Sequence, residues 1–170
     1  MDISTITEAF SDVTIQSPTV GVMLAGLLAV ALVFLSAFAS GSEIAFFSLS
    51  PSDVAELEDG KNPSDRKIQM LREDSERTLA TILITNNFVN VMIVMLLSNI
   101  FVSIVKFGPK AYWLEFLIMT VFLTFLLLLF GEIMPKVYCR QNPLRFCRRC
   151  VDAILFARKI FWPIETILLK

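Results

Sequence analysis

Three short polar clusters interrupt otherwise apolar stretches of the sequence, at residues 40–43 (SGSE), 86–90 (NNFVN) and 131–136 (GEIMPK). They offer hydroxyl, amide and carboxylate oxygens, whereas the chain has no histidine. Oxygen ligands without thiolate or imidazole suit a hard cation such as Mg²⁺, Ca²⁺ or Na⁺. The clusters therefore predict a cation site, and their chemistry alone does not choose among these ions.

The stretches that carry the clusters are long enough to cross a membrane. Residues 13–42, 79–105 and 116–131 contain no Asp, Glu, Lys or Arg, and with their flanks each reaches the ~20 residues of a spanning helix. The hydrophobic fraction of 55% and the mean hydropathy of +0.68 agree with this class. The sequence predicts an all-α integral membrane protein with three spans. The first span is not a cleavable signal, because nothing basic precedes it.

The basic residues set the expected orientation. Lys and Arg number none before the first span, five between the first and second, two between the second and third, and eight from Lys136 onward. The positive-inside rule then predicts an extracytoplasmic segment 1–19, a three-span module 20–142 with a cytoplasmic helical connection 51–78, and a cytoplasmic segment 143–170. The connection is expected to form two short helices. The net charge of −1 gives no indication of a nucleic-acid partner.

An amphipathic pattern follows the third span, after Pro143. It predicts a juxtamembrane helix that lies along the membrane surface and breaks near Pro163, with a fourth span as the alternative. Its cysteines, Cys147 and Cys150, have CxxC spacing but no second pair to complete a zinc site. Free thiols or palmitoylation targets are the readings that this leaves.

The three polar clusters are expected to lie at one depth. A helix rise of ~1.5 Å per residue places Ser40 and Glu43 roughly 10 to 15 Å inside the cytoplasmic end of the first span, and the other clusters at a similar height. Polar side chains at that depth are costly when they face lipid, so they should turn toward one another or toward a water-filled cavity. Asn86 and Asn90 share a helix face, and Asn87 shares a neighbouring face with Asn90.

The third cluster offers a main-chain oxygen as well as a carboxylate. Pro135 cannot donate to the carbonyl of Gly131, which leaves that oxygen free beside the side chain of Glu132.

Each cluster also has a structural explanation. The serines can bond back to carbonyls one turn earlier, the asparagines can join helices, and Glu43 or Glu132 can pair with Lys136.

These motifs resemble the transmembrane module of the CorC/CNNM family of magnesium transporters. The matching stretches are 35–45, 84–90 and 130–136, in order on successive spans, and the likeness runs from about Val20 to the C-terminal helices. The resemblance implies a homodimer in the lipid bilayer, with three transmembrane helices, a juxtamembrane helical belt and a Mg²⁺ site in an inward-facing cavity. By this resemblance the ion-binding positions are Ser40, Asn86, Asn90, the carbonyl of Gly131, and Glu132, with Asn87 and Glu43 also in the motifs.

The resemblance also implies a function. It predicts Mg²⁺ export from the cell across the inner membrane, with Na⁺ as the coupling ion, and regulation by paired CBS-type cytoplasmic domains that lie outside these residues. The alternative is a Mg²⁺-binding membrane anchor or sensor that transports nothing. An enzyme is not expected, because the spans contain no Ser–Lys or paired-Asp arrangement and the chain has no histidine and no cofactor motif.

Overall fold

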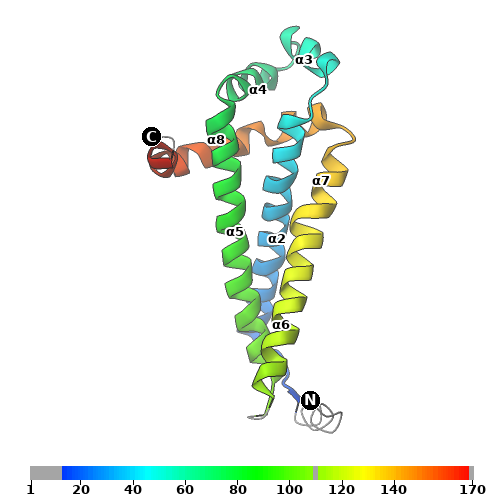
Figure 1. Cartoon of the computed structure of the whole chain (residues 1–170), viewed down its shortest axis with the longest axis vertical. Coiled ribbons are helices and arrows are strands. Elements are labelled where there is room, and N and C mark those ends of the chain that lie inside the picture. Colours follow the sequence, from blue (N-terminus) through cyan, green and yellow to red (C-terminus); the bar gives the residue numbers. More distant parts are fainter. Residues whose placement is uncertain (1–12, 109–110, 169–170) are drawn as a thin grey trace.

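Three long helices run side by side and form the body of the molecule (Figure 1). The computed structural model describes residues 13–108 and 111–168. The first long helix is α2 (Val20–Phe47) and the second is α5 (Ser75–Ile104). The third is continuous but composite: α6 (Tyr112–Leu126), a π-helix η1 (Leu127–Ile133) and α7 (Met134–Cys139). Within the described residues, these three helices are long and apolar enough to cross a membrane, which confirms the predicted three-span, all-α fold.

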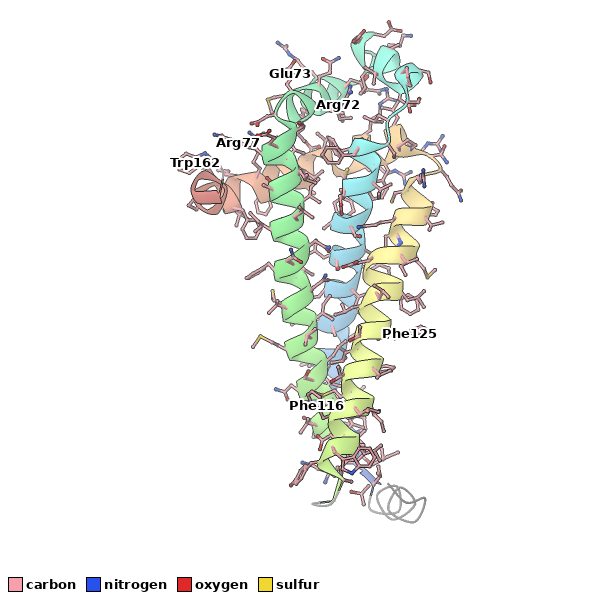
Figure 2. All side chains as sticks on the ribbon, viewed as in Figure 1. Arg72, Glu73, Arg77, Phe116, Phe125 and Trp162 are labelled. Atoms are coloured by element: carbon pink, nitrogen blue, oxygen red, sulfur yellow. The ribbon has the colours of Figure 1, made fainter. Side chains whose placement is uncertain are left out.

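Apolar side chains cover the outside of this bundle instead of being confined to one face. Phe116 and Phe125 of α6 are 68% and 61% exposed, and Phe125 lies on the outer side of the third span in Figure 2. Side chains of this kind all around a helix are typical of a span surrounded by lipid. By contrast, the labelled charged residues Arg72, Glu73 and Arg77 gather at the end of the bundle that carries α4.

The connection between the first two spans contains α3 (Pro51–Glu58) and α4 (Pro63–Glu73), as the sequence predicts. Each begins with a proline and an acidic cap. The Asp53 carboxylate accepts the Ser50 N–H at 2.9 Å, and the Asp65 carboxylate accepts the Asn62 N–H at 3.0 Å. These acceptors satisfy donors that a helix start leaves open, so local sequence fixes where both helices begin.

The last helix, α8 (Pro143–Leu168), runs across the end of the bundle beside α3 and α4 (Figure 1). The expected break near Pro163 is wrong, because the helix continues through it. Proline removes the hydrogen bond to the carbonyl four residues earlier, but its own φ is compatible with a helix. A buried apolar core joins the elements at this end, with Leu57, Ile68 and Leu71 against Cys147 and Val151.

Ion pairs connect α8 to the α3–α4 connection. Arg148 binds Asp65 through two nitrogens, at 2.7 and 3.2 Å, and reaches Glu56 at 2.9 Å. The Asp65 side chain is completely buried, and its hydrogen bonds from Arg148 lower the pKa of the carboxyl below its ordinary value. Arg158 pairs with Asp74, and Lys67 pairs with Asp152 at 2.6 Å.

A small antiparallel ribbon lies at the opposite end of the bundle. Strand β1 (Thr14–Ile15) pairs with β2 (Val105–Lys106), and the Gln16 N–H donates to the Ile104 carbonyl at 2.7 Å. The ribbon joins the start of the first span to the end of the second.

The three cysteines are free and buried where α2, α7 and α8 meet. Cys139 approaches α2 so closely that a Cβ placed on Gly41 would lie 2.6 Å from its sulfur. The described part of the chain has no group of three or more His, Cys, Asp or Glu residues placed to hold a metal.

Candidate cation site

A single serine hydroxyl joins the first two spans at the centre of the polar region. Ser36 Oγ of α2 donates to Asn86 Oδ1 at 3.0 Å and to Asn90 Oδ1 at 2.6 Å, both on α5. Ser36 is completely buried and Asn86 nearly so. Because one hydroxyl carries one proton, it is shared between two carbonyl oxygens, and neither receives a full hydrogen bond from it.

The third span reaches the same point through Gly131, in the π-helix η1. A Cβ on Gly131 would lie 3.1 Å from Ser36 Oγ and 3.9 Å from Asn90 Oδ1. A larger residue would therefore be in tight contact with Ser36 and would require it to shift by a few tenths of an ångström. The glycine lets the third span approach two side-chain oxygens closely, and ion binding by the Gly131 carbonyl stays a prediction.

The helix around Gly131 widens instead of breaking. Residues 127–133 form π-helical turns, and the Met134 N–H bonds to the Leu129 carbonyl five residues back. Pro135 follows with no N–H to donate. The sequence predicts a local interruption at this place, and the structure has a π-helix, a form that is rare and frequent at functional sites.

Ser40 lies one helical turn from Ser36 on α2 and is completely buried. Within the described residues, its Oγ is the only buried side-chain oxygen or nitrogen without a hydrogen-bond partner. An unpaired buried hydroxyl costs roughly 1 to 3 kcal/mol in protein mutational data, so it indicates a position where another group is able to bind. Ser42, by contrast, bonds back to the Phe38 carbonyl at 2.7 Å, as one of the structural explanations predicts.

The acidic residues of the motifs lie at the edge of this group. Glu43 pairs with Lys136 of α7 at 3.1 Å, which is one of the alternatives that the sequence leaves open. Glu132, next to Gly131, is partly exposed, and so is Asn90. Asn87 is exposed on α5, although its neighbour Asn86 is buried. The side-chain oxygens that meet at the centre are therefore neutral ones, from hydroxyl and amide groups.

Ser36 is the central residue that sequence reasoning misses. It stands in an apolar run, four residues before Ser40, so the two serines share one face of the first helix. The spacing of four residues is the feature of the sequence that indicates Ser36. Without the position of α5, however, a lone serine in a span looks the same as one that bonds to its own helix.

Comparison with known proteins shows the family of this chain. A model of the cyclin M transmembrane N-terminal domain matches residues 27–170, which include the polar group and all of α3, α4, α5 and α8. The chain belongs to this family. The match confirms the family resemblance that the motifs of the three spans indicate.

Curated relatives carry the same transmembrane region. A putative DUF21 domain-containing chloroplastic protein of Arabidopsis thaliana is 33% identical over 84% of this chain and 20% of its own length. The metal transporter cnnm-4 of Caenorhabditis elegans is 30% identical over 77% of this chain and 28% of its own length. A UPF0053 protein of Haemophilus influenzae is 30% identical over 76% of this chain and 30% of its own length. The cyclin M domain here thus spans between a fifth and a third of the length of these relatives.

Proposed function

We propose that this chain is the membrane domain of a transporter that carries Mg²⁺ through the oxygen-lined site between α2, α5 and η1. The observation that carries the proposal is the meeting of Ser36, Asn86, Asn90 and Gly131 from three spans. The name of the relative cnnm-4, a metal transporter, supports a metal ion as the cargo.

The chemistry of the site favours a hard cation. Asn86 and Asn90 direct their amide oxygens toward one shared proton, on Ser36, so both keep lone pairs for an ion. The unpaired Ser40 hydroxyl adds a further oxygen one turn away. Mg²⁺ prefers oxygen ligands and keeps several of its waters, so a site of few neutral oxygens suits a partly hydrated ion that must also leave.

Direction and assembly belong to the same proposal. The excess of Lys and Arg in residues 51–78 and after Lys136 supports a cytoplasmic location for α3, α4 and α8, in the cell's inner membrane. The site then opens inward, Mg²⁺ leaves the cell, and Na⁺ entry is the coupled flux. A homodimer in the bilayer, with CBS-type regulatory domains beyond these residues, completes the proposal. Mg²⁺ and Na⁺ are cargo here, and no catalytic step is assigned.

The deciding experiment is Mg²⁺ flux in proteoliposomes, read with an internal Mg²⁺ dye, with and without an opposing Na⁺ gradient. We expect native flux and its loss in Asn90→Ala. Asn99→Ala is the matched control, because Asn99 is an exposed asparagine nine residues further along α5. Equal flux in native protein and Asn90→Ala would exclude the site.

Thermal unfolding with and without Mg²⁺ separates transport from binding. Stabilisation that requires Asn90, without any flux, would support a Mg²⁺-binding anchor or sensor in place of a carrier. The absence of both flux and stabilisation would contradict the cation site itself.

A further inference from the structure

The four arginines of α8 divide into two groups by what faces them. On the side of α3 and α4, each has an acidic partner: Arg148 has Asp65 and Glu56, and Arg158 has Asp74. These charges are balanced inside the chain. They need no external partner.

On the side of α7 the balance is different. A hollow of about 250 Å³ lies between the end of α7 and the first turns of α8, lined by Arg145 and Arg149 together with Gln141, Asn142 and Tyr138. Among the residues that the structure describes, no carboxylate lines it. Both arginines are exposed, and among the described residues neither has an ion pair.

The two arginines are four residues apart, so they lie on one face of α8. Like charges at this spacing repel each other, and an anion between them relieves that repulsion. Guanidinium groups bind phosphate through paired N–H donors. The side-chain amides of Gln141 and Asn142 add neutral donors at the same hollow.

We propose that this hollow binds the phosphate of an anionic phospholipid. The position of the hollow in the fold favours a lipid phosphate over a free phosphate ion. The third membrane-spanning segment ends at Cys139, and Tyr138, which lines the hollow, is 72% exposed. The hollow therefore opens where the span leaves the hydrocarbon, at the level of the phosphates. Exposed aromatic rings are enriched at that level, and anionic lipids attract basic residues beside a span.

The consequence is a lipid that fastens the turn between α7 and α8. This turn follows the span that carries Gly131, so the bound lipid acts on the third span from outside. The inference does not depend on which ion the central site carries.

A phospholipid titration tests this site. The purified chain is reconstituted in phosphatidylcholine vesicles that contain increasing amounts of phosphatidylglycerol, and thermal unfolding is followed at each step. Each arginine near an anionic surface is worth a factor of about five, so Arg145→Gln/Arg149→Gln should raise the half-effective phosphatidylglycerol concentration roughly 25-fold. The matched control is Arg66→Gln/Arg72→Gln, which removes the same charge from exposed positions on α4.

Three results would overturn the proposal. Unchanged phosphatidylglycerol dependence in Arg145→Gln/Arg149→Gln would place lipid binding elsewhere. An equal loss in both double variants would mean that only net charge matters. Equal stabilisation by inorganic phosphate alone would make this a site for a free anion and not for a lipid. Unfolding in phosphatidylcholine alone should be the same for all three proteins, which shows that the variants fold.

Discussion

The polar group inside the bundle and the end where α3, α4 and α8 meet join their helices by different chemistry. Inside the bundle, Ser36 connects two asparagines without any charge, and Ser40 keeps an unpaired hydroxyl. At the α8 end, the buried carboxylate of Asp65 is held by Arg148 above a close-packed apolar core. The polar group inside the bundle leaves oxygens available to bind another group, whereas the charged groups at the α8 end are paired with one another. The difference separates a region that suits binding from one that suits stability.

The largest expected effect is at the α8 end. Asp65→Ala leaves Arg148 without its main partner and removes the acceptor at the start of α4, so we expect a loss of about 3 kcal/mol in the free energy of unfolding. The measurement is denaturant or thermal unfolding in detergent. Asp59→Ala is the control, because its pair with Lys61 is exposed and should contribute little. Equal effects of the two changes would mean that the buried pair does not hold α8.

An intermediate effect is expected at Gly41, where the two regions adjoin. A methyl group there would lie 2.6 Å from Cys139 Sγ and 3.3 Å from the Phe146 ring. Gly41→Ala should therefore cost about 2 kcal/mol by overpacking. Gly26→Ala on the same helix is the matched control, since its Cβ would meet nothing within 4 Å and alanine favours a helix. If Gly41→Ala is as stable as Gly26→Ala, α7 and α8 do not pack against α2 as described.

The smallest loss of stability is expected at the centre of the bundle. Ser36→Ala removes one shared proton and leaves two amide oxygens unpaired, which should cost about 1 kcal/mol. Ser36→Ala should lower the stabilisation that Mg²⁺ provides by more than it lowers the free energy of unfolding without Mg²⁺. The reason is that Asn86 and Asn90 lose the group that directs them. Ser103→Ala, at a partly exposed serine that bonds to a carbonyl of its own helix, is the control. A loss of stability with an unchanged Mg²⁺ response would make Ser36 purely structural.

Much of the fold follows from local sequence. Uninterrupted apolar stretches give the three spans, and the prolines and acidic caps at Ser50 and Asn62 give the starts of α3 and α4. The passage of α8 through Pro163 does not follow in this way, because the rest of the helix outweighs one lost hydrogen bond. The two-residue strands are too short for any pattern to indicate.

The site was predictable in composition and less so in geometry. The sequence indicates Asn86, Asn90 and Gly131, but the outward position of Asn87 and the inward position of Ser36 depend on how α2 and α5 rotate against each other. That rotation is set by contacts between distant residues, such as Leu32 with Val89 and Ile93. Ion binding by the seven motif positions stays a prediction.

The ribbon between β1 and β2 has a mechanical consequence. It closes the far end of the α2–α5 pair, while the Leu32 cluster and the Ser36 bridge fasten the same pair along its length. We therefore expect these two spans to move as one unit. The third span packs on α2 through Leu127, Gly131 and Cys139, and the Glu43–Lys136 ion pair joins them as well. A displacement of the third span would have to break that ion pair, whereas the two Ser36 hydrogen bonds, which join α2 to α5, could persist.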